Sequence, residues 1–227
     1  MRKVFLVCSI AMIAVLFSTG ATLAGKPFEG IITYKITYPD SKFSESQLAM
    51  FPKVLTVSVK GSKSRTDLQM SGMTTVTIDD YAEKTSVSLL NMMGQKYAIK
   101  QTTAEIEKEN TAAGTTTVEL SDETKVIAGY TCKKAVVTVN DDGVKTTYEV
   151  FYSSELGTKV ANFNNPIYKD IDGVLLEFSM KTQMGNMKFT ATDVEKKSLA
   201  AKDFEIPSDY TLTTQDELKS KFGGGNE

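Results

Sequence analysis

Apolar and polar residues alternate in short segments throughout this sequence. In the first segment, Ile32, Tyr34, Ile36 and Tyr38 are separated by threonine and lysine. Successive side chains of a strand point to opposite faces, so this pattern predicts half-buried strands. The same alternation recurs at 55–59, 75–78, 97–99, 148–152, 174–180 and 187–191.

Turn-forming residues separate these segments. Gly61, Gly72, Asn140–Gly143 and Gly185 lie at the breaks and favour tight turns between antiparallel neighbours. A long sheet must curl, close or be covered, because open edges invite aggregation. We therefore expect a mainly β fold, either a curled antiparallel sheet or a half-open β-barrel. One to three short helices are expected where the alternation is interrupted, at 44–51, 104–109 and 215–219.

The N-terminus has the pattern of an export signal. Arg2 and Lys3 precede a mostly apolar run over 4–17, and small residues follow up to Ala24. A charged start, about 7–15 apolar residues and small residues at the cleavage point define such a signal. The run is shorter than the roughly 20 residues of a membrane span. We expect cleavage near Ala24, a periplasmic or otherwise exported location, and no stable membrane span afterwards.

The rest of the chain is expected to form one β-rich domain over 25–222, with a flexible tail at 223–227. Loss of Arg2 and Lys3 leaves 24 of the 26 basic residues, against 28 acidic ones. A mildly acidic chain without a long basic run has no electrostatic reason to bind nucleic acid. Cys132 is then the only cysteine, so we expect no intramolecular disulfide and a small buried side chain.

No catalytic constellation is evident. The sequence contains no histidine, which removes the usual Ser–His and Cys–His pairs, the usual zinc sites and the commonest general base. Acidic pairs occur at Asp79–Asp80, Asp141–Asp142 and Asp170/Asp172, but none has the ligand spacing of a calcium loop. We expect no catalytic residues, no cofactor and no metal site, and hence a protein that is not an enzyme.

Methionine supplies one alternative to that expectation. Met70/Met73 and Met184/Met187 are closely spaced, and thioethers bind Cu(I). Methionine also fills irregular apolar space. Met180 and Met187 fall on predicted inner faces, which favours packing over copper binding.

Large apolar side chains share the predicted inner faces of several strands. A curled sheet of this size encloses either a filled core or a ligand cavity, and the sequence leaves both open. In the second case, the side chains that contact the ligand are Tyr34, Ile36, Tyr148, Phe178, Met180, Met187 and Phe189.

The segment Glu123–Ala135 contains the pattern Ile-x-Gly-Tyr-x-Cys-x-Lys-Ala. With Glu149–Leu156, Phe28–Tyr34 and Phe204–Tyr210, it resembles uncharacterised exported proteins of Gram-negative bacteria related to the GLPGLI family. Asp172–Glu177 stands where the namesake motif of that family would lie and departs from it.

The layout is also similar, more distantly, to the lipoprotein-carrier fold of the LolA/LolB type. That fold is a curled sheet with plugging helices and a cavity for acyl chains. The resemblance implies that the 44–51 helix is a plug, and it brings no catalytic residues.

Together these features predict a non-enzymatic periplasmic protein that binds a hydrophobic or lipid-like ligand in its curled sheet. The first alternative is an envelope structural or protein-interaction module with a filled core and an envelope protein as partner. The second alternative is Cu(I) binding by methionine.

Overall fold

The computed structural model describes residues 28–70, 73–92, 94–182 and 185–222. The predicted export signal, the predicted tail, the Ser71–Gly72 turn and Met184 lie outside these ranges. In the described part of the chain, no helix is both long and apolar enough to span a membrane.

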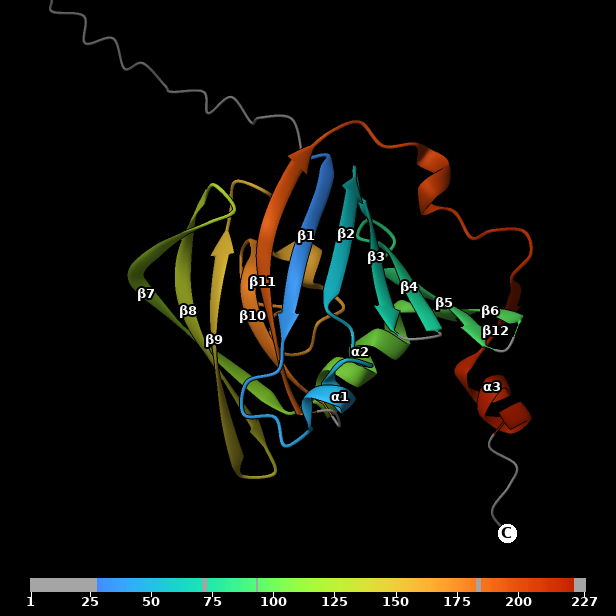
Figure 1. The fold of residues 1–227 in the computed structure, drawn as a ribbon, viewed down its shortest axis with the longest axis horizontal. Helices are drawn as coiled ribbons and strands as arrows, with labels where there is room; N and C mark the ends of the chain where they lie inside the picture. Colours follow the sequence, from blue (N-terminus) through green and yellow to red (C-terminus); the bar gives the residue numbers. More distant parts are fainter. Residues whose placement is uncertain (1–27, 71–72, 93, 183–184, 223–227) are drawn as a thin grey trace, which may run out of the picture.

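Twelve strands form a single curled sheet that does not close (Figure 1). Its order is β12-β6-β5-β4-β3-β2-β1-β11-β10-β9-β8-β7, and every pair is antiparallel except β12 with β6. The prediction of a mainly β, curled antiparallel sheet is confirmed. The strands are β1 (Gly30–Thr37), β2 (Val54–Lys60), β3 (Lys63–Met70), β4 (Met73–Asp80), β5 (Thr85–Met92), β6 (Gln95–Gln101), β7 (Thr115–Ile127), β8 (Tyr130–Asp141), β9 (Val144–Ser153), β10 (Val174–Thr182), β11 (Gly185–Lys196) and β12 (Thr211–Thr213).

The short helices begin where their sequences cap them. Ser44 and Gln47 form a capping box at α1 (Glu45–Leu48), and Thr102 and Glu105 form another at α2 (Thr103–Ala112). A capping box satisfies two backbone N–H groups at the start of a helix, which fixes where the helix begins. The third helix is α3 (Gln215–Phe222), so all three expected helices are confirmed. Two 3-10 turns, η1 (Lys159–Asn162) and η2 (Ala201–Phe204), complete the fold.

Two wings meet between β1 and β2. We call β2–β6 the N-terminal wing, and β1 with β7–β11 the C-terminal wing. The inner face of the sheet is continuous across the junction, because Tyr34 of β1 lies opposite Leu55 of β2 and Ala191 of β11. In the N-terminal wing every pair of neighbours is a consecutive hairpin, whereas in the C-terminal wing β1 pairs with β11 and the segment 154–173 separates β9 from β10.

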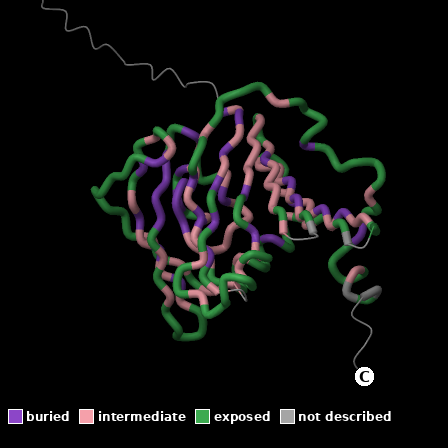
Figure 2. Tube along the Cα trace, in the orientation of Figure 1, coloured by how far each residue is buried: buried purple, intermediate pink, exposed green. Residues whose placement is uncertain are grey.

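The main core lies on the inner face of the C-terminal wing. Tyr34, Phe178 and Phe189 are all less than 10 % exposed there. The segment 154–173 between β9 and β10 covers them with Leu156, Tyr168 and Ile171, which belong to the same cluster. Buried residues are accordingly dense along β1 and β8–β11 (Figure 2).

The N-terminal wing buries its opposite face instead. Val76, Ile78, Leu89 and Ala98 form a smaller cluster, against which Tyr210 packs. The segment 199–213 crosses this back face, where Arg65 donates a hydrogen bond to the Asp203 carbonyl at 3.1 Å. The inner face of this wing stays half-buried; its side chains include Val57, Leu68, Thr75, Leu90 and Ile99.

Candidate functional site

A slot opens where β9 and β10 separate. The two strands pair only from Ser153 to Phe151 and from Val174 to Glu177. Beyond that point, β9 continues with β8 as far as Val144, while β10 continues with β11 as far as Thr182. The gap between the hairpins is a cavity of about 520 Å³. Its lining comes from Pro39 and Asp40, Thr146–Glu149 of β9, Glu177–Ser179 and Lys181 of β10, and Gly185, Asn186 and Lys188 of β11.

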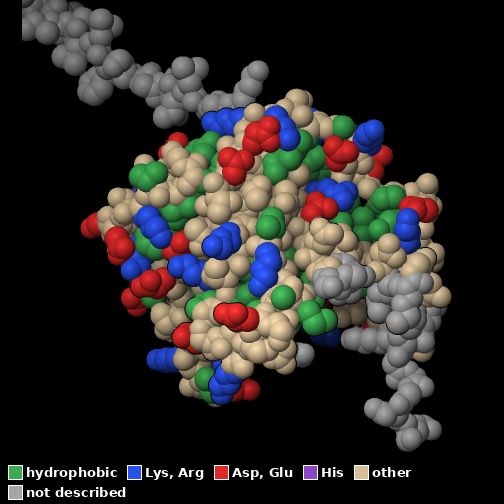
Figure 3. Space-filling model, viewed as in Figure 1, with side chains coloured by type: hydrophobic (Ala, Val, Ile, Leu, Met, Phe, Trp, Pro, Cys, Tyr) green, Lys and Arg blue, Asp and Glu red, His purple; other side chains and the backbone are tan. Residues whose placement is uncertain are grey.

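One wall of the slot is ionic. The carboxylate of Glu177 accepts hydrogen bonds from Lys125 at 3.0 Å and from Thr190 at 3.1 Å, and pairs with Lys188 at 3.2 Å. Burial alone would raise the pKa of Glu177, but the hydrogen bonds from both lysines outweigh it and hold the pKa below its ordinary value. Glu177 is therefore a fixed anion. Charged side chains of both signs are interspersed on the face of the C-terminal wing that is visible in Figure 3.

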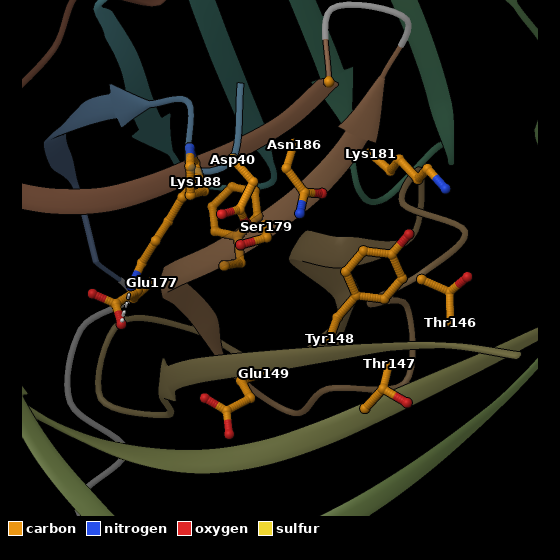
Figure 4. Close-up of a pocket in the computed structure, with 13 residues that line it drawn as sticks. Asp40, Thr146, Thr147, Tyr148, Glu149, Glu177, Ser179, Lys181, Asn186 and Lys188 are labelled. Atoms are coloured by element: carbon orange, nitrogen blue, oxygen red, sulfur yellow. Dashed lines mark ion pairs between the residues drawn. The ribbon is translucent and has the colours of Figure 1, made fainter. Parts of the chain in front are cut away.

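The opposite wall is aromatic. Tyr148 meets Tyr168 edge to face with ring centres 6.3 Å apart, and Tyr168 meets Phe178 in the same way at 5.8 Å. Figure 4 shows the Tyr148 ring projecting from β9 toward the β10–β11 hairpin. Tyr148 is half-buried, so part of its ring is open to a ligand.

Tyr168 fixes the inner end of the slot. Its hydroxyl donates to the Ser179 carbonyl at 2.5 Å and accepts from the Ser179 N–H at 3.3 Å. Burial raises the pKa of Tyr168, so the hydroxyl keeps its proton and serves both backbone groups. At Ser179 the hydroxyl therefore makes the two hydrogen bonds that the backbone of a neighbouring strand would make.

Most of the ligand-binding residues predicted from the sequence lie together in the core. Tyr34, Ile36, Phe178, Met187 and Phe189 are buried, with Phe178 stacked on Phe189 at 4.8 Å. Met180 and Tyr148 are half-buried against the same cluster. Only two of the seven, Tyr148 and Phe178, line the slot.

Sequence reasoning missed the other functional groups of the slot. Glu177 is an acidic residue among the apolar residues of β10, and this could have marked it as a candidate. Its lysine partners, however, come from β7 and β11. Tyr168 and Asp40 lie in irregular segments and reach the slot region through tertiary folding. No local pattern relates them.

A second, smaller pocket of about 280 Å³ lies between α2 and η1. Ile106, Val160 and Phe163 line it together with Lys84 and Lys159. Glu107 and Asp170 also line it, so its charges are mixed.

The described residues contain no group of three or more Cys, Asp or Glu side chains placed to hold a metal ion. Met70 pairs with Met73 across the β3–β4 hairpin, whereas Met187 is buried in the core of the other wing. Cys132 is buried, and burial raises the pKa of its thiol to about 11, which keeps the sulfur protonated and unreactive near neutral pH.

Comparison with known families corrects the resemblance drawn from the sequence. Residues 36–220 match the family described as N-glycanase peptide, N-terminal domain. No curated protein matches the chain. The resemblance to the GLPGLI group and to the LolA/LolB carriers is therefore wrong.

Local geometry explains the error. The Ile-x-Gly-Tyr segment is the β7–β8 turn, where Ala128 and Gly129 both have positive φ, so the pattern reports a tight hairpin rather than a family. The implied plug helix also fails, since α1 buries none of its residues. With four-fifths of its length matched, the chain belongs to the family of N-glycanase peptide, N-terminal domains.

Proposed function

We propose that this chain is a non-enzymatic recognition module that binds the glycan of a glycoprotein in the slot between β9 and β10. The supporting observation is the slot itself, about 520 Å³ in volume, with a partly open tyrosine ring beside charged, amide and hydroxyl side chains. Small-molecule sites usually measure about 300–1,000 Å³. The name of the family, which refers to an N-glycanase, agrees with a carbohydrate ligand.

Sugar chemistry suits both walls. Sugar hydroxyls bond well to charged and amide groups such as Asp40, Lys181 and Asn186, which line the slot. The less polar C–H face of a pyranose ring packs on an aromatic ring such as that of Tyr148. A purely apolar ligand would leave these polar groups without partners.

The electrostatics favour binding over catalysis. A general acid needs a raised pKa to carry a proton near neutral pH. The pKa of Glu177 is instead lowered by its two lysines. Glu149, the other glutamate of the slot, forms an ion pair with Lys134 at 2.8 Å. We extend the proposal to an exported location, which fractionation of the producing cells would test.

Titration with a released N-glycan tests this function. We expect Tyr148→Ala to weaken binding about tenfold, equivalent to roughly 1.4 kcal/mol, because the ring contact is lost. Tyr130→Ala is the matched control, since Tyr130 is also half-buried but is the first residue of β8, beside the β7–β8 turn and away from the slot. No binding by the unmodified chain, or equal loss in both variants, would overturn the proposal.

The hydrophobic-ligand hypothesis is the second candidate, and one observation favours it. The inner face of the N-terminal wing exposes part of an apolar surface that includes Val57, Leu68, Leu90 and Ile99. We propose an acyl chain as the occupant. Fatty-acid binding, measured by titration, should then be abolished by Leu90→Asp. Leu120→Asp, which alters a 72 % exposed side chain of β7, should leave it unchanged. Retained binding in the Leu90 variant would reject this candidate.

A further inference from the structure

The slot is bordered by the edges of two strands as well as by side chains. In an antiparallel strand, alternate residues direct both their N–H and C=O groups to the same neighbour. Ser179 directs both groups to the Tyr168 hydroxyl, on the side of β10 away from β11. Lys181, two residues later, has the same orientation, so its backbone groups face the slot.

The β9 side is arranged in the same way. The pairing of β9 with β10 ends at Phe151, which lies opposite Glu177 at the border of the slot. The alternation that directs Phe151 toward β10 repeats at Glu149 and Thr147, both of which line the slot. Two strand edges therefore face each other where the ladder between them is interrupted.

The volume of the slot matches a short extended peptide. A residue within a sheet occupies roughly 3.4 Å along the strand, 4.8 Å between strands and 10 Å between faces. A cavity of about 520 Å³ therefore holds about three residues, which is the length of edge that Glu149, Thr147 and Lys181 offer.

We propose that the slot binds an extended polypeptide segment of its glycoprotein ligand as an added strand between β9 and β10. This inference rests on the proposed function and adds the protein part of the ligand to it. The added strand restores the interrupted ladder by main-chain hydrogen bonds, as in other cases of strand addition. Its binding is thus largely independent of side-chain identity.

The two faces of the slot set a modest side-chain preference. Alternate side chains of a bound strand point to opposite faces. One face meets the aromatic rings of Tyr148 and Phe178, and the other meets the ion pairs of Glu177 with Lys188. The glycosylated asparagine of a bound segment is therefore directed to the aromatic face, where its sugar packs on Tyr148.

The outer edge of β7 is a weaker site for strand addition, although it is longer. Its pairing with β8 is irregular between Leu120 and Thr124, and Asp122 and Glu123 lie within the irregularity. Irregular pairing and charged residues protect an edge from added strands. The slot edges also carry charged side chains, Glu149 and Lys181, but their described residues show no irregular pairing beyond the single shift at Leu175/Glu177.

The test uses the full chain and the end-blocked pentapeptide Ser-Asn-Val-Thr-Ser, with and without a chitobiose unit on its asparagine. Free chitobiose and a peptide N-methylated at its valine are titrated in parallel. We expect the glycopeptide to bind at least about tenfold more tightly than chitobiose, and N-methylation to remove that gain because it removes a main-chain donor. Amide exchange at Lys181 and Thr147 should slow when the unmethylated peptide binds.

The outcomes separate the two proposals. If chitobiose and the glycopeptide bind equally well, or if N-methylation has no effect, the strand is rejected and the glycan function stands. If neither ligand binds, both proposals fail. If the bare peptide binds and protects Lys181 while chitobiose does not bind, the strand stands and the glycan function fails.

Discussion

The two wings share one sheet and one alternating pattern, yet they bury opposite faces. In the C-terminal wing the segment 154–173 covers the inner face, and Phe178 is 9 % exposed. In the N-terminal wing the segment 199–213 covers the back, and Leu90 on the inner face stays half-buried. The difference shows that alternation specifies the two faces of a strand, whereas the connecting segments decide which face becomes core.

Truncation of a core ring should show the largest difference in stability between the two wings. Phe178→Ala removes a ring that contacts Tyr34, Tyr168 and Phe189. We expect a loss of about 3–5 kcal/mol in the free energy of unfolding, as for other buried aromatic truncations. Leu90→Ala should cost much less, because its site already contacts solvent. Urea unfolding measures both, and equal losses would show that the inner faces are equivalent.

The cover of the C-terminal wing should depend on one buried amide. Asn162, 7 % exposed, donates to the carbonyls of Ile171 and Gly173 at 2.9 Å each. Asn162→Ala removes both hydrogen bonds, although the Ile171 carbonyl keeps the N–H of Gly173 as a donor, so we expect a loss of about 1–3 kcal/mol. Asn91→Ala, at an exposed position of the N-terminal wing, serves as control and should be neutral. Unchanged unfolding of the Asn162 variant would show that the cover is held by other contacts.

Asp79 lies where the cover touches the N-terminal wing and should respond to pH. Burial raises its pKa, although Asn164 donates a hydrogen bond to it at 3.3 Å. A raised folded pKa stabilises the protein below the unfolded value of about 3.9 and loses that contribution as pH rises through the folded value. Asp79→Asn should therefore increase stability at pH 7 relative to the unmodified chain, with the gain shrinking toward pH 3.5. A loss at pH 7 would contradict this.

Glu177 should give the opposite and smallest response. Its pKa is lowered, so its contribution is present above the unfolded value of about 4.3 and is lost as pH falls through the folded value. Glu177→Gln should cost less than about 1 kcal/mol at pH 7, because both lysine partners are more than a third exposed. As pH falls from 7 to 3, the free energy of unfolding of the Glu177→Gln variant should converge with that of the unmodified chain. If the difference between the two proteins stays constant over this range, the ion pairs are not its cause.

Much of the fold was predictable from local pattern. The mainly β class, the tight turn at Asp142–Gly143 and the starts of α1 and α2 all follow from residues close together in sequence. Strands β3, β5, β7, β8 and β12 lie outside the segments predicted from alternation. Of these, β3 and β7 consist mostly of polar residues and show weak alternation. Their place in the sheet comes from neighbours on both sides for β3 and from β8 for β7.

The candidate site was far less predictable. Tyr148 and Phe178 were identified as inward residues, which their alternation signalled. Glu177, Tyr168 and Lys181 acquire their roles only because β9 and β10 part after a short pairing. At the point of separation Tyr168, from the irregular segment between the two strands, occupies the backbone edge of Ser179.

By itself, the sequence determined the mainly β class, the strands in which apolar and polar residues alternate, which of their side chains share a face and where two helices begin, because these depend on contacts within a few residues. Only the tertiary structure decided that β1 pairs with β11, that the wings bury opposite faces and that a slot opens between two hairpins. These features arise from tertiary contacts, some between segments more than a hundred residues apart, such as Tyr34 with Leu175. Their energies come from burial and hydrogen bonding that no local pattern encodes.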